Sequence, residues 1–155
     1  MKPAFNPEDI ACCGLNCSLC HLTTILPQAA QRLKEVMDMD HWEYFGEQLY
    51  PQYKDFRAIL EDLASKDETC PKCIGGCGNP ECPIRICCRA KGYQLCALCP
   101  DYPCEHINAF LQGRYNFLDK SNRRVREIGL EAWLEEQAKL VEQGYCFSRQ
   151  IEESD

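Results

Sequence analysis

The sequence predicts a mainly α-helical fold, a small helical domain with a cysteine-rich, loop-built metal-binding region and at most short strands. Apolar residues recur at three- and four-residue spacing over about 27–66 and about 115–144, which is typical of amphipathic helices. Cysteines are concentrated in residues 13–20 and 70–106. At 155 residues the chain is expected to form a single domain, 1–155.

The first helical stretch is expected to contain three helices. Pro27 suits the first turn of the first one, and Asp40 with Glu43 forms a capping box for a short helix to about Leu49. Pro51 restarts the chain. Two sets of apolar residues are each expected to form one buried helix face: Ala29, Ala30, Leu33, Val36 and Met37, and then Tyr53, Phe56, Ile59, Leu60 and Leu63.

Further helices are expected after the first part of the main cysteine cluster. Pro83 begins a short helix that Gly92 closes, and Cys104 begins another that ends near Leu111. Two amphipathic helices follow between Phe117 and Gln143, with Asp119 as the cap of the first. The second is expected to bury Leu130, Trp133, Leu134, Ala138 and Val141.

The charge of the chain restricts its partners, and its first residues indicate its compartment. The net charge is −7, with 6 basic and 12 acidic residues in 1–69 against 4 and 3 in 70–113. An acidic chain is an unfavourable partner for nucleic acid or an anionic membrane, and no stretch approaches the ~20 apolar residues of a membrane span. The first thirteen residues contain no apolar signal-peptide core, so a cytoplasmic location is expected. There clustered thiols bind metal or do redox chemistry in preference to forming structural disulfides.

The cysteine spacing predicts a metal centre. Nine of the 14 cysteines lie between Cys70 and Cys104, and Cys13-x3-Cys17-x2-Cys20 forms a second cluster in which Gly14 suits a positive φ. Cys-x-x-Cys zinc knuckles separated by loops are typical of tetrahedral thiolate zinc sites. Zinc is therefore the expected metal, and an iron–sulfur cluster is the alternative.

Three other interpretations of the first cluster are weaker. Its spacing matches that of radical S-adenosylmethionine enzymes, but the chain has neither their length nor their strand–helix repeat. Cys17-x2-Cys20-His21 matches the motif for covalent haem attachment, but that reaction normally takes place after export and the sequence shows no signal peptide. A thioredoxin-type redox pair is disfavoured because no strand–helix alternation surrounds the cysteines. A hydrolytic zinc site is also disfavoured, because only three histidines occur and none forms a His-x3-His pair. The sequence therefore favours a non-enzymatic protein over an enzyme, without deciding between them.

Several motifs together resemble a family of small cysteine-rich bacterial and archaeal proteins known only as domain of unknown function 3795. They are Cys13-Gly-Leu-Asn-Cys17-Ser-Leu-Cys20, Cys70-Pro-Lys-Cys73, Cys82-Pro-Ile-Arg-Ile-Cys87, Cys96-x-x-Cys99, Tyr102-Pro103-Cys104 and Gly129-x3-Trp133-Leu134, over about residues 11–140. The resemblance implies ten ligands: Cys13, Cys17, Cys20, Cys70, Cys73, Cys82, Cys87, Cys96, Cys99 and Cys104. It leaves out Cys12, Cys77, Cys88 and Cys146, and this chain has His21 where the family tends to have proline.

Ten thiols fill two four-ligand sites with two to spare, so two zinc ions are expected. By spacing, Cys17, Cys20, Cys70 and Cys73 share one ion, with Cys13 as the substitute, while residues 21–69 fold back as a hairpin-like helical insertion. The second ion is assigned to Cys82 or Cys87 together with Cys96, Cys99 and Cys104, and His106 is an alternative fourth ligand. The predicted function is a zinc-stabilised binding module of unknown biological role, whose helical surface meets a partner that the sequence does not identify; an iron–sulfur redox protein is the alternative.

Overall fold

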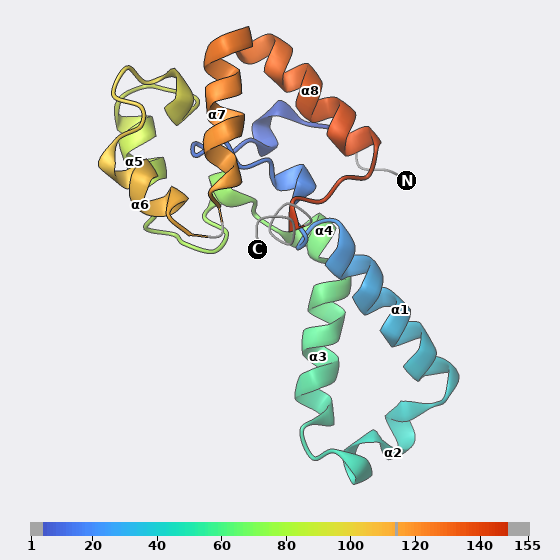
Figure 1. The fold of residues 1–155 in the computed structure, drawn as a ribbon. Helices are drawn as coiled ribbons and strands as arrows, with labels where there is room; N and C mark the ends of the chain where they lie inside the picture. The colour runs from blue at the N-terminus through green and yellow to red at the C-terminus, as the bar shows by residue number, and fades with distance from the viewer. Residues whose placement is uncertain (1–4, 114, 149–155) are drawn as a thin grey trace. The chain divides into compact units, whose positions relative to one another are not determined.

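The computed structural model describes residues 5–113 and 115–148 and confirms the mainly helical prediction. Those residues contain eight α-helices and several single-turn 3₁₀ segments (Figure 1). They contain no named β-strand, only one isolated antiparallel bridge between Ile10 and Asn16. No helix among them is long and apolar enough to cross a membrane.

The chain divides into two compact units. Residues His21–Cys70 form one, which we call the helical unit, and the chain on either side of it forms the other, which we call the cysteine-rich unit. The helical unit matches the helical insertion predicted for residues 21–69. The single domain predicted for 1–155 stays a prediction, because two compact units can still fold together as one domain.

The helical unit consists of α1 (Ile25–Met39), α2 (Trp42–Leu49), α3 (Tyr53–Ala64) and the short α4 (Lys66–Thr69). Within it, α1 and α3 pack side by side, and α2 connects their ends (Figure 1). Its core is small and comprises Ala30, Met37, Tyr53 and Leu60. Gly46 of α2 lies directly against the Tyr53 ring, so that even a Cβ at this position would collide with it.

Two details of the predicted helices are wrong. The capping box of Asp40 and Glu43 does not form, because α2 begins at Trp42 after His41, which has a left-handed φ of 56° and provides no side-chain cap. Several residues assigned to buried faces are exposed instead: Leu33, Val36, Phe56 and Ile59. The reason is that α1 and α3 pack through a narrow seam, which covers only part of each apolar stripe.

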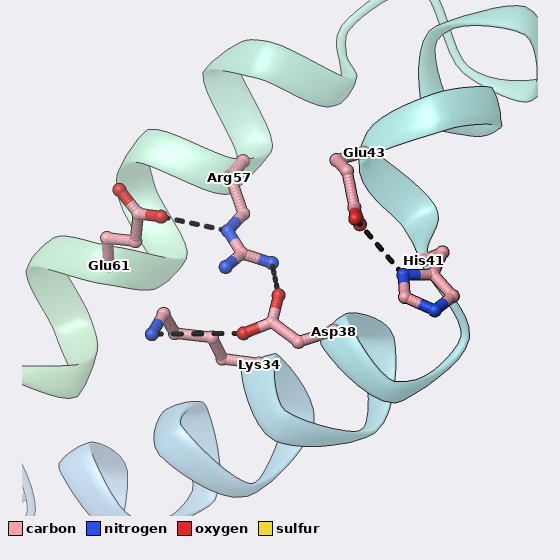
Figure 2. A network of polar contacts seen from close by, with 6 residues as sticks. All are labelled: Lys34, Asp38, His41, Glu43, Arg57 and Glu61. Atoms are coloured by element: carbon pink, nitrogen blue, oxygen red, sulfur yellow. Dashed lines mark hydrogen bonds and ion pairs between the residues drawn. The ribbon is translucent and has the colours of Figure 1, made fainter.

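Ion pairs reinforce the seam between α1 and α3 (Figure 2). The Arg57 guanidinium donates to Asp38 of α1 at 2.7 Å and to Glu61 on its own helix at 2.9 Å. Lys34 approaches the same Asp38 carboxylate at 3.9 Å. Arg57 therefore links the two helices, and it holds the pKa of Asp38 below its usual range.

The cysteine-rich unit combines 3₁₀ turns with four helices. The turns are η1 (Pro7–Asp9), η2 (Cys17–Leu19), η3 (Cys73–Gly75) and η4 (Cys96–Leu98). The helices are α5 (Pro83–Ala90), α6 (Glu105–Leu111), α7 (Phe117–Ile128) and α8 (Leu130–Glu142). As predicted, Pro83 is the first residue of α5 and Cys104 is the N-cap of α6.

Helices α7 and α8 supply much of this unit's core. Val125 and Trp133 are almost fully buried against Leu95 and Ala97, and the Trp133 indole N–H donates to Ser121 Oγ at 3.1 Å. The prediction of Asp119 as the cap of α7 is wrong, because it lies inside the first turn after Asn116. The Asp119 carboxylate instead accepts hydrogen bonds from the Tyr102 hydroxyl and from Arg123.

Candidate metal centre

The amino-terminal cysteine loop is fixed by side chains that bind its backbone. Asn16 is almost fully buried; its Oδ1 accepts from Ser18 N–H at 3.0 Å, and its Nδ2 donates to Gln137 of α8 at 3.3 Å. This cap starts the η2 turn that carries Cys17. The cysteine loop is therefore anchored to a helix more than a hundred residues later in the chain.

Gly14 and Asn122 form a second anchor of the same loop. Gly14 has the predicted positive φ, at 92°, and an added Cβ would collide with Asn122 Oδ1. Asn122 is fully buried in α7, and its Nδ2 donates to the Cys13 carbonyl at 3.0 Å. Its Oδ1 has no hydrogen-bond partner within the described residues. The Cys13 backbone is thus held by one amide in a close-packed contact.

Cys17 and Cys73 meet, although 56 residues separate them in the chain. The Cys73 N–H donates to Cys17 Sγ at 3.2 Å. A hydrogen bond with the Cys73 thiol, and then burial, raises the pKa of the Cys17 thiol. An amide N–H directed at a thiolate sulfur is the usual support of a metal–thiolate bond, so this contact is the kind that such a site needs.

Arg85 fixes the loop that carries Cys73. Its side chain is only 9 % exposed, and its guanidinium donates to the Cys73 carbonyl at 2.7 Å and to the carbonyls of Asn79 and Pro80. Arg89, one turn later on α5, donates to the Ile74 carbonyl at 2.8 Å. Both arginines place positive charge beside the cysteine loops while binding backbone oxygens.

Five thiols line a cavity of about 220 Å³ next to Arg85: Cys12, Cys13, Cys73, Cys77 and Cys82. Apolar side chains close the rest of it, including Ile84 and Phe110. Burial, followed by the fields of neighbouring thiols, raises the pKa of Cys13 to about 12. Cys12 and Cys77, which the family resemblance does not require, therefore lie in the same cavity as three predicted ligands.

Five other thiols surround a much smaller cavity of about 20 Å³: Cys87, Cys88, Cys96, Cys99 and Cys104. Such a volume is close to that occupied by one water molecule or one ion, about 10–30 Å³. Burial is the main reason why the pKa of Cys88 is raised to about 12 and that of Cys96 is also raised. Lys91 lies at the same cavity and pairs with Asp101.

The predicted ligands thus fall into separate groups. Cys73 contacts Cys17 and also lines the larger cavity together with Cys13 and Cys82, whereas the smaller cavity is lined by Cys87, Cys96, Cys99 and Cys104. Cys20 is half-buried beside the Leu15 and Leu19 core, and Cys70 is the last residue of the helical unit. His106 lines neither cavity. In the described parts of the chain, no three His, Cys, Asp or Glu side chains are placed to hold one metal ion together.

The donor set fits a soft metal. All the side chains grouped at the smaller cavity that can act as ligands are thiols, and thiolates favour zinc or iron–sulfur clusters over magnesium or calcium. Burial raises the free energy needed to ionise each thiol, and a bound cation lowers it again by neutralising the thiolate charge.

Sequence reasoning did not identify the residues that support the loops, namely Asn16, Asn122 and Arg85. Asn122 lies in a helix whose sequence gives no sign that it faces the cysteine loop more than a hundred residues earlier. Arg85 stands within the Cys82-Pro-Ile-Arg motif, and that position was the one available signal.

Comparison with known proteins identifies one family. A family model described as a protein of unknown function (DUF3795) matches residues 9–109. The match covers the cysteine segments and ends before the Gly129–Leu134 motif. Neither a curated protein nor a solved structure matches the chain.

Proposed function

The chain belongs to the family of proteins of unknown function DUF3795. Because the family's name states no activity, we propose from the residues of the chain itself that this is a structural zinc protein that acts as a binding module. It holds two zinc ions. Thiolates fold the cysteine-rich unit around them, and the helical unit offers the surface for a partner.

The meeting of thiols from distant segments is the observation that carries this proposal. Cys17 and Cys73 share one ion, with Cys13 and Cys20 as further ligands from the same unit. Cys87, Cys96, Cys99 and Cys104 hold the second ion, because they surround one small cavity. Cys82 lines the larger cavity instead, which favours Cys87 between the two alternatives that the spacing left open.

Zinc supplies no redox chemistry, because Zn²⁺ has a filled d shell. Its role here is to cross-link loops that have few large apolar residues of their own. The thiols of the first site come from segments 56 residues apart, so that ion would close a long loop, whereas the thiols of the second site lie within Cys87–Cys104 and that ion would close a short one. Arg85 and the Cys73 N–H support the thiolates by placing positive dipoles and charge beside them.

An iron–sulfur protein is the second candidate, and the larger cavity favours it. Five thiols line a volume of about 220 Å³, which exceeds the volume of a single ion. Iron–sulfur clusters are polynuclear and are held by cysteine thiolates. Colour separates the two candidates, because thiolate-bound iron clusters absorb visible light and zinc does not.

Metal analysis of the purified protein, with an optical spectrum, tests the proposal. We expect two zinc ions per chain and no visible absorption. Cys17→Ser and Cys73→Ser should each remove one ion, and the double variant should lose no more than either alone, because both residues serve one site. Cys146→Ser is the control, because this buried cysteine contacts Ser148 and lines neither cavity.

One ion, three ions or a brown iron-containing protein would contradict the proposal. Loss of two ions in the double variant, one for each substitution, would place Cys17 and Cys73 in different sites.

A further inference from the structure

The helical unit carries an apolar groove that its own chain leaves exposed. We use this name for a depression of about 550 Å³ lined by Leu33, Val36, Tyr50 and Phe56 above the buried Met37 and Tyr53. The four upper side chains are between 38 % and 59 % exposed. Nine of the twelve large hydrophobic residues that are exposed in the described parts of the chain belong to this unit, although it spans only residues 21–70. Exposed apolar surface concentrated in one place marks an interaction site.

The groove has a defined shape, because the aromatic residues around it support each other. The Trp42 and Tyr50 rings stack with centroids 6.4 Å apart and an interplanar angle of 8°, and Trp42 also contacts Tyr53. The Arg57 bridge between α1 and α3 fixes the two helices that form its walls (Figure 2). Helices that present such a groove typically receive the apolar face of another helix.

The charge of the unit specifies the polar face of that helix. The unit has ten acidic and five basic side chains, a net charge of −5. Every one of the five cations is already paired with a carboxylate of the same unit: Arg32 with Glu35, Lys34 and Arg57 with Asp38, Lys54 with Glu47, and Lys66 with Asp62. The unit that carries the groove therefore has a negative net charge, and none of its cations is without a carboxylate partner.

Asp40 provides an anchor for a cation within the groove itself. It is the one charged residue of the lining, and no ion pair occupies its carboxylate in this fully described unit. Asp40 is the C-cap of α1 and is exposed, so a partner that occupies the groove can reach it. An incoming lysine or arginine would complete the pairing that the unit's own cations do not supply.

From these contacts we infer that the apolar groove binds an amphipathic helix of a partner protein whose polar face carries lysine or arginine. This inference deepens the binding-module part of the proposed function. A second copy of the chain is a poor occupant, because each copy carries a net charge of −7 and the copies repel each other.

Two designed peptides test the inference on the full-length protein as purified. One is a two-heptad helix with leucines on one face and lysines on the other, and its twin has glutamate in place of each lysine. We expect the lysine peptide to bind at least tenfold more tightly than the twin in a fluorescence-anisotropy titration. Its affinity should fall as salt is added, because the charges at the rim are exposed to solvent.

Substitutions then locate the binding. Phe56→Gln should weaken the lysine peptide at least tenfold, and Tyr50→Gln serves as a second variant, because Tyr50 lines the groove from the end of α2. Asp40→Asn should weaken it about two- to fivefold, as expected for one exposed ion pair. Ile59→Gln is the matched control, because Ile59 is 59 % exposed on the same α3 helix and does not line the groove.

Equal binding of the two peptides, absence of binding, or unchanged affinity in both Phe56→Gln and Tyr50→Gln would overturn the inference. A dimer that Phe56→Gln dissociates, measured by light scattering, would assign the groove to self-association and would also overturn it. Zinc content is measured in each sample. Peptide binding by a protein that contains no zinc would support this inference and contradict the structural-zinc proposal. Bound zinc in a protein that does not bind the peptide would support the zinc proposal and contradict this inference.

Discussion

Different interactions stabilise the interior of each of the two units. In the helical unit, two amphipathic helices pack through four buried apolar or aromatic residues and are linked by ion pairs on the surface. In the cysteine-rich unit, buried polar side chains bind loop backbone: Asn122 holds Cys13, Arg85 holds Cys73, and Asn16 caps the Cys17 turn. The first unit depends on helix packing, and the second depends on fixing loops in which thiols gather. The difference implies that metal removal and mutation should affect the two units unequally.

Chelation should have the largest effect, and it should separate the units. If structural zinc folds the loops, its removal withdraws on the order of 10 kcal/mol or more per ion from the cysteine-rich unit. Hydrogen exchange should then rise first between Cys70 and Cys104, while the amides of α1 and α3 change little. Unchanged thermal stability after verified metal removal would contradict the proposed role of zinc.

Asn122→Ala should have an intermediate effect, confined to the cysteine-rich unit. The substitution leaves the half-buried Cys13 carbonyl without its donor and opens space beside Gly14, at a cost of about 1–3 kcal/mol. Chemical denaturation measures this loss. The control is Asn108→Ala on α6, where the exposed amide makes only a 3.5 Å contact, and it should change stability little. Equal effects of the two substitutions would show that Asn122 does not hold the loop.

The smallest effect concerns the ion pair of the helical unit at low pH. The hydrogen bond from Arg57 lowers the pKa of Asp38 below its ordinary value of 3.8, and the field of Lys34 adds less. The pair therefore contributes fully above about pH 4, the unfolded pKa, and its contribution is lost as pH falls through the lower folded pKa. An NMR titration of the Asp38 carboxyl should show the midpoint rising in Arg57→Met, and rising less in Lys34→Met. A midpoint that Arg57→Met does not move would contradict the bridge.

Elements with strong local signals were predictable from the sequence. Pro83 and Gly92 delimited α5, Gly14 adopted the positive φ expected for its loop, and the amphipathic stretches became helices. Other features depended on tertiary contacts. The interior of α7 gives no sign that Asn122 reaches Cys13, and a capping box at Asp40 was locally plausible although His41 adopted a left-handed conformation instead.

The grouping of the cysteines was predictable in part, whereas their binding of metal stays a prediction. Spacing identified Cys96, Cys99 and Cys104 as members of one group, and the structure gathers them around one cavity with Cys87. Spacing alone did not place Cys12 and Cys77 beside Cys13, because that cavity forms only when α5 and the amino-terminal loop meet. Similarly, the apolar periodicity of α1 and α3 did not distinguish a face buried by the chain itself from one left exposed in a groove.

The insertion of the helical unit between Cys20 and Pro71 has a consequence for synthesis. The ribosome completes the amino-terminal thiols first and then adds the 50 residues of the insertion before Cys73 exists. At roughly 5–20 residues per second this delay lasts about 3–10 s. If Cys17 and Cys73 share a zinc ion as proposed, Cys17 must remain reduced until Cys73 has been added, and this order of translation would then make zinc loading depend on a reducing environment.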